Sequence, residues 1–384
     1  MSDDSAGASV DRVTEVSSTG WLSSIVGSFI GALVGFAMVV ASCALLYWNE
    51  GRGVAAYTAL EAGSHQVVEA GADPAGTAGL VHVTGPVAVQ TPARDPVFGV
   101  GGNGAVRLRR GVEMYQWQEH QTQETHRNTG GSTTTETTYT YSQDWADHLI
   151  DSSRFHVANG HQNPPMPVPP ATFDGGGPTI GAYKLDPGMV SQLTDWTAVA
   201  VPDGVAAPAG YQRVGDTLVR AHDPAAATVG DVRVAFSQIA PQVSSMVAAA
   251  SSGVLTPYRG QNGVTIALAA PGSVSAAELF KEKEHEEGVM TWVLRGAGFV
   301  VMLIGLMLIA RPLAVVVSVL PFLETIADAG VFLMALAVAV PLTLVVIAVA
   351  WFAHRPLLAG GLIAAAVVAL VAFRLMAPGR RKTA

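Results

Sequence analysis

The sequence predicts a membrane protein with four transmembrane α-helices, one N-terminal and three C-terminal, and a large β-rich α+β domain inserted between the first and the second. Nearly half of the 384 residues are hydrophobic and only 14% are charged, which is too apolar for an ordinary soluble domain. The apolar residues gather near both ends of the chain, whereas residues 49–288 carry most of the acidic and His side chains. The ends therefore supply the membrane segments, and the middle folds as a polar domain.

The first membrane helix is predicted at residues 22–48, an apolar run without a charge. The run is longer than the roughly 20 residues that cross the hydrocarbon core. A signal peptide is the alternative, but it has a basic start and a shorter apolar core, and residues 1–21 are acidic overall. Gly27, Gly31 and Gly35 recur every fourth residue on one face of this helix. We expect helix packing or oligomerisation through them, with a helix of the same chain or of a second subunit.

The three late membrane helices are predicted at residues 289–310, 331–353 and 356–373. Residues 311–330 hold Pro, Glu and Asp among apolar side chains, and each acidic group at membrane depth would cost about 2 to 3 kcal/mol. We therefore predict an interfacial or re-entrant segment there. Arg295 lies about one turn into the second span. Snorkelling to the interface is the favoured interpretation of it, and a buried ion pair with Glu50 is the alternative.

The basic residues near the last span predict the orientation of the chain. Residues 374–384 form the densest basic cluster beside any span, and such clusters stay on the cytoplasmic side. With four spans, the N-terminal tail of residues 1–21 is also cytoplasmic. The domain of residues 49–288 is then exoplasmic.

The central domain is predicted to be mostly strands. Residues 105–119 and 135–142 alternate apolar and polar side chains around a polar loop, which predicts a long β-hairpin. Residues 163–177 are rich in Pro and Gly and are expected to be extended; the domain divides there if it has two lobes. The other expected elements are a helix at 55–69, a strand pair at 79–90, a helix at 144–155 and strands at 212–220, 229–238, 246–252 and 263–269.

A charged helix is predicted to link the domain to the second span. Ser275 and Glu278 form a capping box at its start, and it continues to residue 287. Gly288 is a place where this helix can break before the span.

The residue patterns favour no catalytic, cofactor or metal site. The sequence has no GxSxG elbow, no P-loop and no GxGxxG after a strand. Glu119, His120, Glu124 and His126 form the only local group of metal-capable side chains, and they lack the HExxH spacing. A net charge of −8 without a basic stripe argues against a nucleic-acid partner. Cys43 is the only cysteine, so an intrachain disulfide is excluded.

Several short motifs resemble the transmembrane protein 43 (LUMA) family, in order and with the same layout of spans, from about residue 27 to the C-terminus. The residues that carry the resemblance are Asn49, Glu50, Gly51 and Arg52 after the first apolar run, Glu113, Met114, Tyr115, Gln116 and Trp117 in the predicted hairpin, and Trp145, Gly230, Asp231 and Arg295 further along. Residues 163–210 depart from the animal members. The Ala- and Val-rich composition indicates a bacterial member from a high-GC genome.

The resemblance implies a protein without an established catalytic activity that self-associates and organises other membrane proteins. It implies the plasma (inner) membrane for a bacterial member, and the endoplasmic reticulum or inner nuclear membrane for a eukaryotic one. The first hypothesis is therefore a non-enzymatic scaffold in the lipid bilayer, a homo-oligomer that acts through its exoplasmic domain. The alternative is a membrane-bound enzyme or lipid-binding protein acting on envelope material, with Glu113, Asp144 and His148 as candidate residues. A channel or transporter has the least support, because the spans hold hardly any ionisable residue at mid-depth.

Overall fold

The computed structural model describes residues 11–71, 73–128, 132–202, 208–223, 226–317 and 324–355. Contacts divide these residues into two units. A β-rich unit holds the described residues up to Ser18, Glu61–His126 and Thr134–Lys283. A helical unit holds Thr19–Leu60, Arg127–Thr133 and the described residues from Glu284 onward. Each unit is described by itself.

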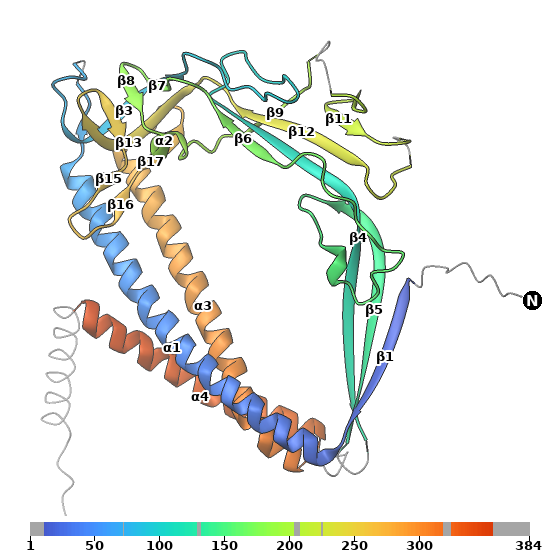
Figure 1. The fold of residues 1–384 in the computed structure, drawn as a ribbon. Coiled ribbons are helices and arrows are strands. Elements are labelled where there is room, and N and C mark those ends of the chain that lie inside the picture. The colour runs from blue at the N-terminus through green and yellow to red at the C-terminus, as the bar shows by residue number, and fades with distance from the viewer. Residues whose placement is uncertain are drawn as a thin grey trace, which may run out of the picture. The chain divides into compact units, whose positions relative to one another are not determined.

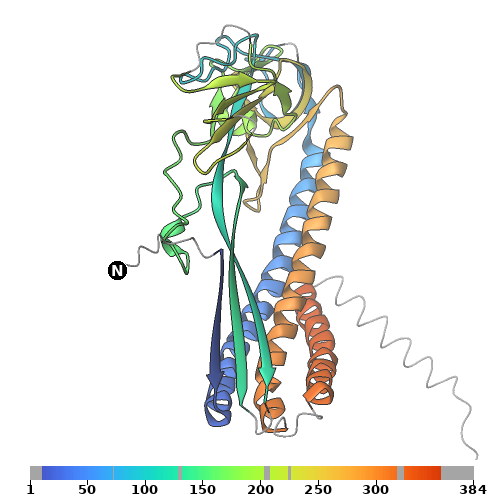
Figure 2. The same ribbon diagram turned by 90° about the vertical axis from the view of Figure 1, so that its right-hand side faces the viewer.

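Three long helices dominate the helical unit: α1 (Trp21–Gln66), α3 (Ala276–Val317) and α4 (Glu324–His354), shown in Figures 1 and 2. Each is long and apolar enough to cross a membrane. The predicted spans at 22–48, 289–310 and 331–353 lie inside α1, α3 and α4, so three of the four predicted spans are present as helices. The fourth, at residues 356–373, and the basic tail at 374–384 lie outside the described residues.

The segment between the second and third spans is helical where the structure describes it. α3 continues through Arg311 and Pro312 to Val317, and α4 begins at Glu324. That this segment is interfacial or re-entrant stays a prediction. Pro312 is accommodated inside the helix, as proline often is in transmembrane helices, where neighbouring groups satisfy the freed backbone carbonyl. The two acidic residues that motivated the prediction, Glu324 and Asp328, belong to the first turns of α4.

Close packing of α1 on α3 uses glycine. A Cβ built on Gly35 would lie 2.5 Å from the Gly305 carbonyl oxygen, and one built on Gly305 would lie 2.8 Å from the Gly35 carbonyl oxygen. Ser42 donates a hydrogen bond of 2.6 Å to the Gly298 carbonyl. Such contacts let two backbones approach where lipid offers no hydrophobic drive to association. Of the predicted packing glycines, Gly35 therefore packs inside the chain.

Gly27 and Gly31 are placed differently. A Cβ on either would meet nothing within 4 Å among the described residues. Large apolar side chains on the same stretch of α1 are also exposed, with 60% or more of Phe29, Ile30 and Leu33 accessible. This part of α1 is open to lipid or to another helix.

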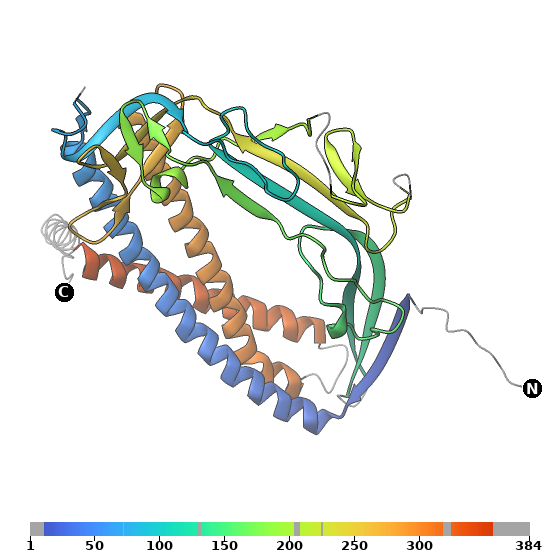
Figure 3. The same ribbon diagram turned by 45° about the horizontal axis from the view of Figure 1, so that its top comes forward.

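The β-rich unit contains two large sheets and a two-stranded one. The eight-stranded sheet has the order β1-β5-β4-β12-β11-β10, with β6 paired to β4 and β9 paired to β12. Its strands are β1 (Arg12–Thr19), β4 (Arg107–Arg127), β5 (Thr133–Ala146), β6 (Ala171–Asp174), β9 (Thr197–Val199), β10 (Gln212–Val214), β11 (Thr217–Arg220) and β12 (Val232–Ile239). Figure 3 shows the long antiparallel pair of β4 and β12. Phe98, Leu108, Met114 and Phe236 are among the residues buried in its core.

The seven-stranded sheet has the order β17-β13-β14-β8-β7-β3-β2. Its strands are β2 (Val68–Glu69), β3 (Gly79–Ala88), β7 (Thr179–Ile180), β8 (Tyr183–Leu185), β13 (Val243–Ser251), β14 (Val254–Thr256) and β17 (Leu268–Pro271). β13 also pairs with β3 along most of its length, and the short helix α2 (Pro187–Val190) adds Met189 and Val190 to the core. β15 (Tyr258–Arg259) and β16 (Thr265–Ile266) form the small sheet.

Most predicted elements of the domain are present, but several differ in extent or type. The predicted hairpin is β4 and β5, which reach Arg127 and begin at Thr133, so the strands extend into the Thr-rich segment that was expected to be a loop. The strand pair predicted at 79–90 is the single strand β3. The helix predicted at 144–155 is wrong, since β5 continues to Ala146 and only a short 3₁₀ turn, η1 (Ser152–Arg154), follows. Trp145, which the prediction placed on a helix face, packs edge-on against Tyr115 with 5.4 Å between the ring centroids.

The capping box and the charged helix are confirmed. The Glu278 carboxylate accepts hydrogen bonds from the backbone N–H and the hydroxyl of Ser275, and these bonds lower the pKa of Glu278. The Ser275 hydroxyl in turn accepts from the Glu278 N–H. Gly288 does not interrupt α3, which runs on as one helix.

The first strand bears on the predicted sidedness of the chain. β1 lies in the tail predicted to be cytoplasmic, yet it pairs with β5 at the edge of the eight-stranded sheet. Only Gly20 separates it from the start of α1. A bilayer-spanning α1 places the residues before it and the domain after it on opposite sides of the membrane. The pairing of β1 with β5 and a bilayer-spanning α1 therefore cannot exist together. The outcome depends on whether the free energy gained by inserting α1 exceeds the free energy lost when β1 leaves β5.

Membrane insertion is the larger of the two effects. Burying an exposed Val, Leu, Ile or Phe side chain is worth about 1.5 to 3 kcal/mol, and several such residues of α1 are exposed, so insertion gains on the order of 10 kcal/mol. The side chains of β1 are nearly all exposed, and its cross-strand pairs contribute only about 0.2 to 1 kcal/mol each. We therefore expect insertion of α1 into a bilayer to separate β1 from β5. The prediction that the N-terminal tail and the domain of residues 49–288 lie on opposite sides of the membrane stays unchanged.

This expectation is tested by labelling single cysteines with a membrane-impermeant maleimide in sealed vesicles, in a Cys43→Ser background. Cysteines at Val16 in β1 and at Gln143 in β5 should label from opposite sides. Labelling of both from one side would show that the β1 and β5 pairing persists and that α1 does not span.

Candidate functional site

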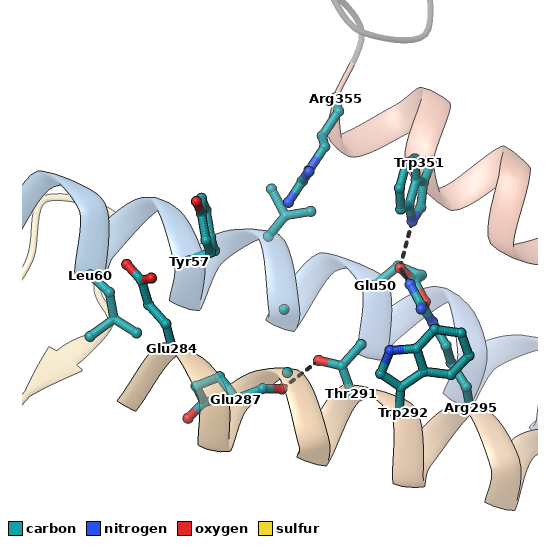
Figure 4. A pocket seen from close by; sticks show the side chains of 13 residues that line it. Glu50, Tyr57, Leu60, Glu284, Glu287, Thr291, Trp292, Arg295, Trp351 and Arg355 are labelled. Carbon is teal, nitrogen blue, oxygen red and sulfur yellow. Dashed lines mark hydrogen bonds and ion pairs between the residues drawn. The ribbon is translucent and has the colours of Figure 1, made fainter. Parts of the chain in front are cut away.

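A polar cluster lies where the apolar run of α1 ends. Glu50 is only 3% exposed, and Arg295 of α3 holds both of its carboxylate oxygens. The Arg295 Nε donates to Oε1 at 2.6 Å and Nη2 donates to Oε2 at 2.8 Å, which is the two-pronged geometry that guanidinium and carboxylate favour. The indole N–H of Trp351 in α4 donates to Oε2 at 2.7 Å (Figure 4). One carboxylate thus connects three helices.

The role predicted for Arg295 was wrong. Its guanidinium turns toward Glu50 in place of reaching out to the interface, and it lies 4.8 Å from the ring centroid of Trp292. A lone buried carboxylate is costly, and an arginine on the facing helix removes that cost by supplying two charge-assisted hydrogen bonds. The alternative ion pair with Glu50 is the observed one.

The neighbours of Glu50 in sequence complete the cluster. The Asn49 side-chain amide donates to the Thr291 carbonyl at 3.0 Å, and Arg52 forms an ion pair with Glu287 and a 3.3 Å hydrogen bond with the Thr291 hydroxyl. We call Asn49, Glu50, Arg52, Glu287, Thr291, Arg295 and Trp351 the Glu50 cluster. The Arg52 pair is about one-quarter exposed, so it is weaker than the Glu50 pair.

Two glycines bring the helices close enough for these bonds. A Cβ on Gly51 would lie 2.8 Å from the His354 ring of α4, and one on Gly53 would lie 3.0 Å from the Thr291 hydroxyl of α3. The run from Asn49 to Gly53 thus alternates between polar side chains that bond across the helices and glycines that allow contact.

A cavity of about 210 Å³ opens beside the cluster. Tyr57 and Leu60 of α1 and Glu284 of α3 line it together with the ends of Arg295, Trp351 and Arg355 (Figure 4). The Arg355 guanidinium lies 5.5 Å from the Trp351 ring centroid and 6.0 Å from that of Tyr57. The cavity therefore has acidic, basic and aromatic walls.

The other family-like positions lie in the β-rich unit and have structural roles. Glu113 on β4 pairs with Arg233 on β12, whose guanidinium lies 4.3 Å from the Trp145 ring centroid. Met114 and Gln116 are fully buried, and the Gln116 side chain bonds the backbone of His148 and Ile150.

A second group closes the base of the hairpin. Trp117 and Asn163 exchange backbone and side-chain hydrogen bonds. Gly230 has a φ of 99°, which glycine adopts without strain, and its N–H bonds the Tyr115 carbonyl. Asp231 accepts hydrogen bonds from the backbone N–H and the hydroxyl of Thr228. These residues fix the geometry of the sheet.

The residues considered for an enzyme do not converge. Glu113 is occupied by Arg233, His148 pairs with its exposed neighbour Asp147, and Asp144 bonds the N–H of Trp145. The metal-capable group is also dispersed, since Glu119 bonds the Tyr141 hydroxyl and the His156 N–H while His126 lies 3.8 Å from Glu124 at the surface. Burial and the Glu119 bond raise the pKa of Tyr141 to about 12.

Comparison with known proteins now identifies the family. The family model described as Transmembrane protein 43 matches residues 114–356. The chain belongs to the transmembrane protein 43 family. It is 31% identical over 386 residues to Transmembrane protein 43 of Mus musculus and 30% identical over 387 residues to that of Homo sapiens, with 96% of each chain covered. The homolog from Drosophila melanogaster is 29% identical over 87% of this chain and 91% of its own. No solved structure gives a significant match.

Membership of the transmembrane protein 43 family agrees with the resemblance that the short motifs carried. The motif Asn49 to Arg52 is part of the Glu50 cluster, and Arg295, which the resemblance also included, is its partner. Sequence reasoning missed Trp351 and Glu287. The available signal for Trp351 was a tryptophan at the polar end of a predicted span, a pattern that fits an interfacial residue equally well.

We expect the Glu50 and Arg295 pair to be strongly coupled in stability. Arg295→Gln should destabilise the helical unit by about 3 to 5 kcal/mol, because it leaves a buried carboxylate without its charge partner. The double variant with Glu50→Gln and Arg295→Gln should be less destabilised than the single variant Arg295→Gln, since no buried charge remains at the pair. Thermal unfolding followed by circular dichroism in detergent measures both.

Arg52→Gln serves as the matched control, because its pair with Glu287 is partly exposed, and it should have a smaller effect. If the two substitutions at Glu50 and Arg295 were simply additive, the pair would contribute no coupling and its role in holding the helices would be refuted.

Proposed function

We propose that the protein is a non-enzymatic membrane scaffold that self-associates through its membrane helices and organises other membrane proteins through its exoplasmic domain. The observation that carries this proposal is the Glu50 cluster. Its charged groups bond one another across α1, α3 and α4, with both oxygens of the Glu50 carboxylate occupied. A carboxylate whose oxygens are both hydrogen-bonded stabilises the packing of the three helices and is poorly suited to proton transfer or nucleophilic attack.

The open face of α1 supports self-association. Gly27 and Gly31 have nothing within 4 Å of an added Cβ among the described residues, and exposed apolar side chains surround them. A small-xxx-small spacing lets a second helix approach closely in lipid. The occupant we propose is the same helix of a second copy of the chain.

The continuity of the helices supports a scaffold. α1 and α3 run for 46 and 42 residues, well beyond the roughly 20 that a bilayer requires. The capping box at Ser275 starts α3 cleanly, and the Glu50 cluster fixes it to α1. Both helices run without a break from the helical unit into the β-rich unit.

The proposal predicts different results for two neighbouring glycines. Gly31→Leu should reduce cross-linked oligomers of the full-length protein in detergent while leaving its melting temperature unchanged, because the added side chain meets nothing within the chain. Gly35→Leu should lower the melting temperature, because its Cβ would meet the backbone of α3. Gly296→Leu adds the same bulk at another open position and should change neither.

Cross-linking and detergent-corrected light scattering measure the oligomer. A monomeric wild-type protein, or an unchanged oligomer in Gly31→Leu, would contradict self-association through this face.

A further inference from the structure

The cavity beside the Glu50 cluster is lined by two charged side chains, Glu284 and Arg355, that form no hydrogen bond or ion pair with the cluster among the described residues. Glu284 is half-buried, and within the described part of the chain its carboxylate has no hydrogen bond or ion pair. Arg355 is also half-buried, and its guanidinium lies near the rings of Tyr57 and Trp351 and within electrostatic reach of the Glu50 carboxylate. Both residues line the cavity, Glu284 from α3 and Arg355 from the position after the end of α4 (Figure 4).

The remaining charges around the cavity cancel. Glu50 is neutralised by Arg295, and Glu287 is neutralised by Arg52. This leaves one carboxylate and one guanidinium facing the cavity. A ligand that complements both has an anionic group for Arg355 and a cationic group for Glu284. Arginine binds phosphate through directed hydrogen bonds, and a carboxylate binds a primary ammonium in the same way.

The location of the cavity indicates a lipid. Its walls include Trp292, which is 70% exposed, and Trp351, and nearby Trp48 is 57% exposed. Tryptophan gathers at the depth of the lipid headgroups, and these residues lie where the apolar runs of the helices end. The cavity of about 210 Å³ is smaller than the about 300 Å³ or more of a site for a drug-sized molecule, so it suits a headgroup whose acyl chains stay in the bilayer.

We propose that this cavity binds the headgroup of a zwitterionic phospholipid with a primary ammonium, of the phosphatidylethanolamine type. Arg355 binds the phosphate, and Glu284 accepts hydrogen bonds from the ammonium. Tyr57 and Trp292 cover the headgroup from the sides. An anionic phospholipid without an ammonium leaves Glu284 unpaired, and a choline headgroup offers it no N–H donor, so both bind more weakly. This inference goes beyond the scaffold proposal and does not depend on self-association.

Native mass spectrometry of the full-length protein tests the proposal, with phosphatidylethanolamine, phosphatidylcholine and phosphatidylglycerol of the same acyl chains added separately. The wild-type protein should retain phosphatidylethanolamine most strongly. Glu284→Gln should weaken that binding about tenfold, as expected for the loss of one charged hydrogen bond, and bring it to the level of phosphatidylcholine. Arg355→Gln should weaken the binding of all three lipids, because each has the phosphate.

Glu282→Gln is the matched control, since Glu282 is exposed on the same helix and does not line the cavity. The melting temperature of each variant shows whether it is folded. If Glu284→Gln loses stability, Glu284→Asp replaces it, because it keeps the charge and should retain part of the preference for phosphatidylethanolamine. Equal retention of the three lipids by wild type, or an unchanged preference in Glu284→Gln, would overturn the proposal. Displacement of the lipid by soluble phosphoethanolamine at similar concentration would also overturn it and assign the cavity to a small soluble ligand.

Discussion

The carboxylate of Glu50 is the point on which the helical unit depends. It is almost completely buried, and its oxygens receive hydrogen bonds from Arg295 on α3 and from Trp351 on α4. A charge at this position costs several kcal/mol unless it is paired, so the three helices have to meet with these side chains aligned. Many apolar arrangements of three helices would have similar energies, because lipid and side chains are equally apolar. The ion pair selects one of them.

Glycine makes that selection possible. Gly35 and Gly305 bring α1 and α3 into backbone contact, and Gly51 and Gly53 bring α4 and α3 close to the cluster itself. The run from Asn49 to Gly53 therefore provides both the charged group and the close approach that it requires. Glu284 and Arg355 line the cavity next to these paired charges. A structural cluster and a proposed lipid site thus lie side by side and share part of their walls, but the charged groups proposed to bind the lipid, Glu284 and Arg355, are not members of the cluster.

The sequence predicted much of this architecture, and the failures have physical causes. Uncharged runs located α1, α3 and α4, since hydropathy is a local property, and the capping box placed the start of α3. Arg295 and Glu50 lie 245 positions apart, and spacing alone does not show which helices meet, so the snorkelling interpretation was preferred. Trp145 produced a false helix because an aromatic at a strand end has the same local pattern as one on a helix face. Gly35 contacts α3 and Gly31 does not, and this difference depends on where α3 packs against α1. A local sequence motif does not contain that information.

The most direct test of the central claim is the distance between α1 and α4 near the Glu50 cluster. Spin labels at the exposed positions Thr58 and Phe352, in a Cys43→Ser background, report this distance by pulsed electron paramagnetic resonance without touching the cluster. We expect a narrow distribution in the parent protein and a broad one in Glu50→Ala, because α4 loses the hydrogen bond of Trp351. A distribution that is equally narrow with and without the Glu50 carboxylate would contradict the account, since apolar packing alone would then hold the helices together.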